Sequence, residues 1–189
     1  MDSKKILKIG GIFLPAFIFL FFVSFVYADI LNDVKNLKIG VDGFFIGEKL
    51  KNVKNFERVK KFYPGTLKFR YKNLYITVTK KEKIIVGLYK KFDNASFEDL
   101  KKTISFLMIK FGEPTIEAHG KTIYWFYSKN GKISNEEFLK QKEKGTIKKP
   151  LLMIKFHSNK FISDKNSDSK YSFYFIIYSE GLIREFIKR

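Results

Sequence analysis

Several residue types are scarce or absent in this chain of 189 residues, and each absence narrows what the protein can be. The absence of cysteine excludes disulfide bonds, thiolate metal sites, cysteine nucleophiles and a lipid anchor attached through cysteine. The only two histidines, His119 and His157, have no second histidine at metal-binding spacing. The nucleophile-elbow motif G-x-S-x-G of serine hydrolases is also missing. We therefore predict no cofactor, no bound metal and no enzymatic activity.

Arginine is rare too, although the chain is strongly basic. Lysine and arginine total 37 against 19 acidic residues, a net charge of +18, yet only four of the basic residues are arginine. Arginine recognises phosphate in a bidentate manner, whereas lysine is a hydrated point charge. Many Ile, Phe, Asn and Tyr residues accompany the lysines, a profile typical of A+T-rich coding. Much of the charge is therefore interpreted as solvated surface rather than as a dedicated polyanion site.

Long hydrophobic runs are confined to the N-terminus. Three lysines precede an apolar stretch, and Val26 and Ala28 are the small residues that signal peptidase requires before its cut. This pattern predicts a signal peptide over residues 1–28, cleaved after Ala28. The chain would then be periplasmic or extracellular, with a net charge of +16 because the signal holds three Lys and one Asp. The alternative is an uncleaved inner-membrane anchor, since the stretch from Ile9 to Ala28 approaches the roughly 20 residues that span a bilayer.

Alternation of apolar and polar residues predicts that antiparallel strands dominate the chain after residue 28. The alternation is clearest over residues 67–72 and 74–79, where every second residue is apolar or aromatic. Further, less regular strands are expected over residues 84–89, 121–128, 151–157 and 171–178. The last of these has almost no charge and is expected at the centre of the sheet.

Two main helices are predicted from apolar spacing and end signals. Apolar residues three apart predict a helix over 50–62, which Pro64 and Gly65 would end. The second helix, over 96–111, has Ser96 as N-cap with Asp99 three residues later, and Gly112 with Pro114 at its end. A short polar helix is expected over 134–144, and a helix or strand over 182–188.

These elements predict a single α+β domain over residues 29–189. We expect an antiparallel β-sheet of five or six strands with two main helices packed on one face. The order of one helix, three strands, one helix and three strands also suggests a duplicated helix-plus-meander unit. Such a chain is long enough to bury a core without covalent staples.

Two short motifs resemble a known group of exported proteins. Residues Gly43 to Val53 follow the pattern G-x-x-x-G-x-x-x-x-x-V, and Leu107 to Pro114 follow L-x-x-x-[FY]-G-x-P. Both patterns are similar to those of the β-lactamase-inhibitor-protein-like and SmpA/OmlA-type superfamily. The resemblance implies a two-layered α+β module that binds other proteins or supports outer-membrane assembly. The chain lacks the lipidation cysteine of the SmpA/OmlA pattern, and no functional residue carries over.

Aromatic residues interleaved with basic ones indicate a candidate binding surface. Tyrosine, tryptophan and arginine are common anchors of protein interfaces, and an uncovered sheet face would display them together. We predict that the partner-binding residues are Lys68, Arg70, Lys72, Tyr75, Tyr89, Trp125 and Tyr127. Tyr174 and Tyr178 are further tyrosines available on strands. The alternative is that several of these rings pack in the core or at its rim.

The predicted function is a non-enzymatic, exported binding module that engages a protein partner in the cell envelope. The partner would bind the open face of the sheet or the lysine-rich stretch 129–149. The alternative is a cationic binder of anionic lipid headgroups or envelope polysaccharide, whose binding would weaken steeply with salt. Because the chain is expected to be exported, nucleic acid is not an expected partner. An enzyme would require His119 and His157 to lie close to each other or to a carboxylate.

Overall fold

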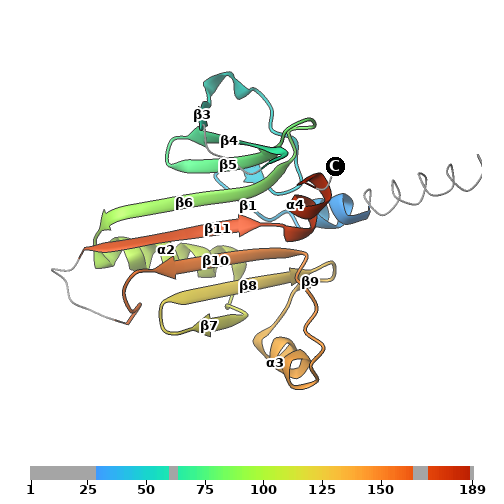
Figure 1. The fold of residues 1–189 in the computed structure, drawn as a ribbon. Helices are drawn as coiled ribbons and strands as arrows, with labels where there is room; N and C mark the ends of the chain where they lie inside the picture. Colours follow the sequence, from blue (N-terminus) through green and yellow to red (C-terminus); the bar gives the residue numbers. More distant parts are fainter. Residues whose placement is uncertain (1–28, 60–63, 164–169, 188–189) are drawn as a thin grey trace, which may run out of the picture.

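The computed structural model describes residues 29–59, 64–163 and 170–187, and strands dominate this part of the chain (Figure 1). Residues 29–36 are helical. The N-terminal half then contains β1 (Gly40–Val41), β2 (Phe44–Phe45), the 3-10 helix η1 (Val53–Asn55), β3 (Glu57–Val59), β4 (Thr66–Tyr71), β5 (Leu74–Thr79) and β6 (Ile85–Ala95). The second half contains α2 (Phe97–Phe111), β7 (Ile116–Ala118), β8 (Thr122–Ser128), β9 (Gly131–Lys132), α3 (Asn135–Glu143), β10 (Leu152–Ser158), β11 (Tyr171–Tyr178) and α4 (Glu180–Ile187).

Nine strands form one antiparallel sheet, so the predicted sheet of five or six strands was wrong. Their order is β3-β4-β5-β6-β11-β10-β8-β7, with β9 paired to β8, while β1 and β2 form a separate two-stranded sheet. The additional strands have only two or three residues each. Period-two alternation needs at least four residues to be recognised, and hydrogen bonding to a longer neighbour forms these short strands instead. The prediction of two main helices was also wrong, because α3, α4 and the helical residues 29–36 accompany α2.

The predicted helix over 50–62 is not formed in its described part. Residues Val53–Asn55 make a single 3-10 turn, and β3 follows with Val59 paired to Lys68. The ring of Phe56 packs against three other aromatic rings, with centroids 5.2–6.4 Å apart. Tertiary packing therefore replaces the expected helical stripe, while residues 60–63 lie outside the described residues. Without this helix the first meander has no helical partner, so the predicted duplicated helix-plus-meander unit was wrong as well.

The helix predicted over 96–111 is confirmed as α2, with the expected cap. The Ser96 hydroxyl accepts a hydrogen bond from the Asp99 backbone N–H, and the Asp99 carboxylate accepts one from the Ser96 N–H. Each of these two hydrogen bonds satisfies a backbone N–H at the start of the helix that has no partner within the helix. Gly112 ends the helix at a φ of 75°, which favours glycine. The buried side chains of α2 face the sheet: Leu100, Ile104, Leu107 and Phe111.

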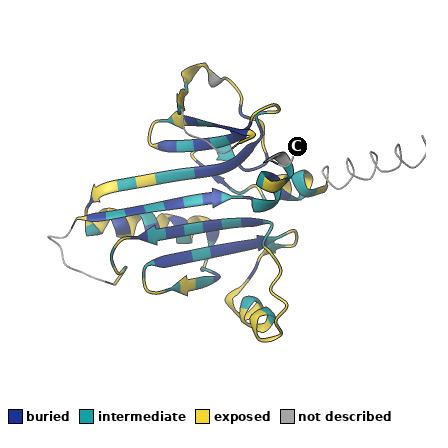
Figure 2. Ribbon diagram, in the orientation of Figure 1, coloured by how far each residue is buried: buried dark blue, intermediate teal, exposed yellow. Residues whose placement is uncertain are grey.

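The core lies between α2 and one face of the sheet. Figure 1 shows α2 behind the central strands, and Figure 2 shows buried and half-buried residues alternating along β10 and β11. β11 pairs with β6 on one side and β10 on the other, which confirms its predicted central position. Its inward-facing residues Phe173, Phe175 and Ile177 are at most 2% exposed. One face of the sheet is therefore filled with apolar side chains, and the other carries the residues considered below.

The remaining helices lie at the periphery. The predicted polar helix is confirmed as α3, whose N-cap Ser134 accepts a hydrogen bond from the Glu137 N–H. Residues Glu180–Ile187 form α4, so the helix and not the strand is found over the described part of 182–188. None of the helices in the described residues has the length and hydropathy to cross a membrane. The predicted signal peptide, with its cleavage after Ala28, lies outside the described residues.

Candidate functional site

The face of the sheet opposite α2 is the main candidate for a binding surface. Along β10, Leu152, Ile154 and Phe156 are buried beneath α2, so the residues between them point to the other side. No helix crosses the middle of this side in the described part of the chain (Figure 1). α3 covers only its β8 end, where the Phe138 and Phe126 rings lie 5.5 Å apart. We call this surface the open face and define it by these residues: Lys68, Tyr75, Tyr89, Tyr124, Lys155, His157 and Tyr174.

A row of aromatic rings crosses the open face over four neighbouring strands. The Tyr75 and Tyr89 centroids are 5.9 Å apart, and those of Tyr89 and Tyr174 are 5.5 Å apart. The row ends at His157, 5.5 Å from the Tyr174 ring. Cross-strand aromatic pairs of this kind stabilise a sheet and hold the rings in place. All four side chains remain half-buried, so each ring keeps a surface for a partner.

Two lysines lie over these rings and supply the charge of the open face. The Lys68 Nζ lies 4.7 Å from the Tyr75 centroid and 5.4 Å from that of Tyr89. The Lys155 Nζ lies 5.8 Å from Tyr124 and 5.9 Å from Tyr174. All four distances allow a cation–π attraction. Neither lysine has a carboxylate within ion-pair distance in the described residues. The centre of the open face therefore carries two positive charges without an acidic counterpart.

The acidic residues near the open face lie at its border. Arg70 pairs with Glu57 at 2.6 Å, and Lys91 pairs with Asp93 at 2.8 Å. A hydrogen bond with Tyr75, followed by the charge of Glu57, raises the pKa of the Arg70 guanidinium. Burial lowers the pKa of Lys155, but a hydrogen bond and electrostatic contact with Tyr174 outweigh it, and the net shift is upward. These groups therefore stay cationic at neutral pH.

His157 is the one group of the open face expected to titrate near neutral pH. Its Nδ1 lies 2.8 Å from the Thr122 hydroxyl oxygen. Burial lowers the pKa of the imidazole, and the neighbouring Lys155 and Lys121 lower it further. His157 is therefore neutral at pH 7. In the described residues no group of three or more His, Asp or Glu side chains could hold a metal ion.

Because the pKa of His157 is lowered, we expect the stability of the folded chain to depend on pH. Because the folded chain binds this proton less readily than the unfolded chain, His157 contributes stability above its unfolded pKa of about 6.5. That contribution is lost as the pH falls through the lower folded pKa. NMR titration of the imidazole should give a folded pKa below 6.5, and Lys155→Met should raise it. The distant Lys51→Met should leave it unchanged, and a folded pKa above 6.5 would contradict the expected repulsion.

The structure brings together four of the seven predicted partner-binding residues. Lys68, Arg70, Tyr75 and Tyr89 lie next to each other on β4, β5 and β6. Lys72 belongs instead to the β4–β5 turn, where its φ is 54° and its Nζ lies 5.5 Å from the Tyr71 ring.

Trp125 and Tyr127 point away from the open face into the core. The Trp125 side chain is 0% exposed, and its Nε1 donates a hydrogen bond of 2.7 Å to the Gly112 carbonyl. The Tyr127 hydroxyl donates to the Phe111 carbonyl at 3.4 Å, and burial raises its pKa to about 12. For these two residues the structure shows the alternative considered from the sequence, in which the rings pack in the core. Through their hydrogen bonds, both connect the end of α2 to β8.

Sequence reasoning did not select Lys155, Tyr124 and His157 as members of the open face. Lys155 and His157 alternate with buried apolar residues on β10, so the alternation of that strand could have identified them. Tyr124 lies on a strand whose residues are mostly buried on both sides, and no such signal existed there. No protein-family model, curated protein or solved structure matches this chain. The resemblance to the β-lactamase-inhibitor-protein-like and SmpA/OmlA-type group stays a prediction.

Proposed function

We propose that the protein is a non-enzymatic, exported binding module that engages a protein partner in the cell envelope through its open face. The observation that supports this most directly is the pair of lysines, Lys68 and Lys155, which lie over tyrosine rings and have no carboxylate partner among the described residues. Tyrosine supplies a large, rigid contact area with a polar tip. A lysine held over such rings is positioned for an acidic side chain of the partner.

The open face favours a protein over an isolated small ligand because its rings are spread out in a row. The row follows the sheet over four strands, from β5 to β10. The two hollows described for this chain lie elsewhere, beside α3 and α4. A partner that covered the row would bury several half-exposed tyrosines at once, which is how protein interfaces gain most of their affinity. The partner surface should therefore be flat, partly apolar and acidic.

Site-specific photo-crosslinking tests this proposal in the cells that make the protein. A photoreactive phenylalanine analogue is placed at Tyr89 or Tyr174 on the open face, and at Phe106 on the exposed side of α2 as a control. We expect both open-face positions to give the same crosslinked envelope protein and the Phe106 position to give none. Tyr89→Ala should lower the crosslink yield from position 174 about tenfold, since interface tyrosines often contribute 1–2 kcal/mol.

Two outcomes would contradict the proposal. Crosslinks to the same protein from Phe106 and from the open face would show that contact is not confined to this surface. Crosslinks only to lipid or polysaccharide, lost between low and moderate salt, would favour the alternative of a cationic binder of envelope polyanions.

A further inference from the structure

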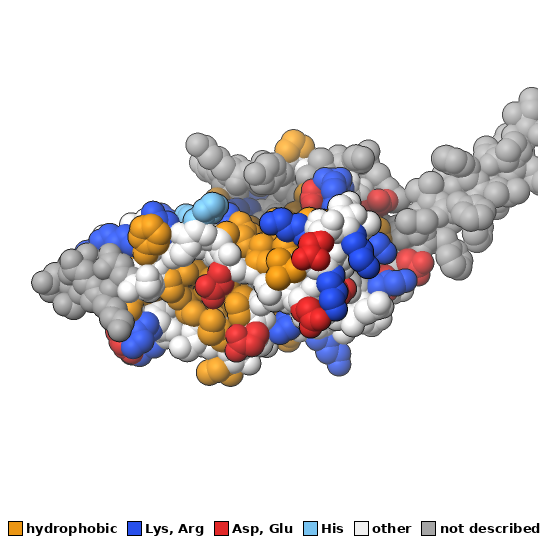
Figure 3. Space-filling model, turned by 90° about the horizontal axis from the view of Figure 1, so that it is seen from below, with side chains coloured by type: hydrophobic (Ala, Val, Ile, Leu, Met, Phe, Trp, Pro, Cys, Tyr) orange, Lys and Arg blue, Asp and Glu red, His pale blue; other side chains and the backbone are white. Residues whose placement is uncertain are grey.

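A second surface, separate from the open face, surrounds two adjoining hollows at one end of the sheet. Each hollow has a volume of about 440 Å³, and Ser128, Lys129, Lys148 and Lys149 line both. The three lysines belong to the lysine-rich stretch 129–149, and Figure 3 shows basic side chains gathered near this end together with some acidic ones. We call this surface the basic groove and define it by these residues: Lys129, Lys140, Lys144, Lys148, Lys149 and Arg184.

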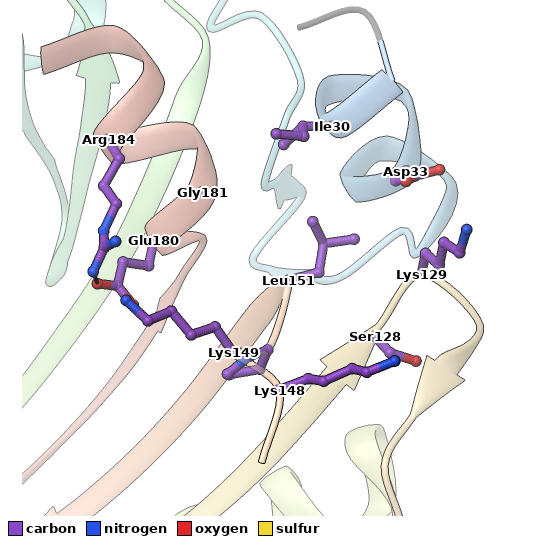
Figure 4. Close-up of a pocket in the computed structure, with 11 residues that line it drawn as sticks. Ile30, Asp33, Ser128, Lys129, Lys148, Lys149, Leu151, Glu180, Gly181 and Arg184 are labelled. Carbon is purple, nitrogen blue, oxygen red and sulfur yellow. Dashed lines mark hydrogen bonds and ion pairs between the residues drawn. The ribbon is translucent and has the colours of Figure 1, made fainter. Parts of the chain in front are cut away.

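The basic groove combines an apolar floor with a cationic border. Figure 4 shows the side chains of Ile30 and Leu151 pointing into the space between helix 29–36, α4 and the start of β10. Both of these floor residues are half-buried, whereas Lys129, Lys148 and Lys149 at the border are exposed. A ligand that matches this arrangement has an anionic head and an apolar body.

Most of the positive charge in the basic groove is not neutralised by the protein. Arg184 pairs with Glu180, and Lys140 pairs with Glu136. The other four lysines have no carboxylate within ion-pair distance in the described residues: Lys129, Lys144, Lys148 and Lys149. Two carboxylates without an ion pair in the described part of the chain line the hollows: Asp33 beside helix 29–36 and Glu137 on α3. Four like charges on one surface repel one another, and an anionic ligand would relieve that repulsion.

The position of the basic groove in the chain indicates which anion it meets. Ile30 lines the groove, and it lies two residues after Ala28, the last residue of the apolar stretch 9–28. This mainly apolar stretch has 20 residues, which is about the length that crosses a bilayer. With the uncleaved inner-membrane anchor, the alternative given in the sequence analysis, Ile30 follows the membrane segment by two residues. Basic residues next to a membrane-inserted segment are attracted to anionic lipids.

We propose that, in the chain that keeps residues 9–28 as an uncleaved anchor, the basic groove binds the anionic phospholipid headgroups of the same bilayer. The lysines contact the phosphates, and the apolar floor receives the upper part of the lipid. This interaction does not depend on the proposed function of the open face, which lies on a different part of the sheet. It would orient the domain on the membrane and leave the open face available to a partner.

The test uses the full chain, including residues 1–28, reconstituted into vesicles of phosphatidylcholine with or without phosphatidylglycerol. The chain has no cysteine, so Asn130→Cys places a single fluorophore beside Lys129. A lipid with a spin-labelled headgroup then quenches this fluorophore when the basic groove lies against the bilayer. We expect strong quenching in vesicles that contain phosphatidylglycerol, little in pure phosphatidylcholine, and a loss of the difference at high salt.

Charge variants decide whether the basic groove itself is responsible. Replacing Lys129, Lys148 and Lys149 by Gln should weaken the phosphatidylglycerol-dependent contact by at least tenfold, because each lysine at an anionic surface contributes about fivefold. The matched control replaces Lys51, Lys54 and Lys81 by Gln, which removes the same charge elsewhere and should change little.

Three results would overturn the proposal. One is equal quenching of a fluorophore at Ser105→Cys on α2, and another is an equal effect of the two triple variants. The third is loss of the contact when soluble glycerol phosphate is added at millimolar concentration, because a free phosphate would then be the preferred ligand.

Discussion

Replacing Trp125 by alanine should lower the free energy of unfolding by about 3–5 kcal/mol, the largest stability effect expected in this chain. The indole is fully buried, packs 6.5 Å from the Phe111 ring, and donates the hydrogen bond that holds the Gly112 carbonyl. Its removal opens a cavity and leaves that carbonyl without its donor. Folded domains are more stable than their unfolded chains by only about 5–15 kcal/mol, so such a loss would unfold a large fraction of the molecules in a domain of low stability. Urea titration measures this loss of free energy. Far-UV circular dichroism is the suitable signal, because Trp125 is the only tryptophan and its replacement removes the tryptophan fluorescence.

Two companion variants separate the causes of this loss. Trp125→Phe keeps most of the packing but removes the N–H donor, and should cost less than Trp125→Ala. Tyr124→Ala changes the adjacent residue, which points to the open face and is half-buried, and should cost about 1 kcal/mol. If Tyr124→Ala cost as much as Trp125→Ala, the assignment of the two faces of β8 would be incorrect.

Reversing both charges of the open face, with Lys68→Glu and Lys155→Glu, should abolish capture of the partner. The change places two carboxylates where we propose that acidic groups of the partner bind, and like charges in an interface cost several kcal/mol. The crosslink yield from a photoreactive residue at Tyr89 should therefore fall by at least a hundredfold. Both lysines are half-exposed, so the urea midpoint should move little.

A matched double variant on the other side of the sheet controls for net charge. Lys102→Glu and Lys110→Glu alter two exposed lysines of α2 and change the charge of the chain by the same amount. They should leave the crosslink yield within about twofold of the unmodified protein, allowing for long-range screening. An equal loss in both double variants would mean that overall charge, and not the geometry of the open face, attracts the partner.

Local patterns predicted the elements whose own residues decide their structure. Ser96 and Gly112 bracket α2 because capping depends on neighbours three or four residues away. The alternation of β4 and β5 placed Lys68 and Tyr75 on the same side of the sheet, because each strand has one side against the core. Three of the seven residues that define the open face, Lys68, Tyr75 and Tyr89, were therefore among the predicted partner-binding residues.

The features that could not be predicted from the sequence depend on contacts between segments far apart in the chain. The ring of Phe56 belongs to an aromatic cluster with Phe44 and Tyr71, and no local spacing shows that this cluster outweighs a helix. On β8, Phe126 is buried by Phe138 of α3, so both sides of the strand are apolar. Without alternation, nothing local distinguishes the inward Trp125 from the outward Tyr124. The number of strands was also unpredictable, because the shortest ones exist only as neighbours of longer strands.

The central position of β11 has a consequence for how the chain matures during synthesis. Of the strands in the described residues, β11 is made last, yet it lies between β6 and β10 and joins the two meanders. Until residues 171–178 are available, β6 exposes a long row of unpaired backbone groups, a form prone to wrong pairing. The finished sheet ends instead in β3 and β7, which have three residues each. A chain cut short before Tyr171 would therefore expose the unpaired edges of both β6 and β10, which β11 otherwise covers.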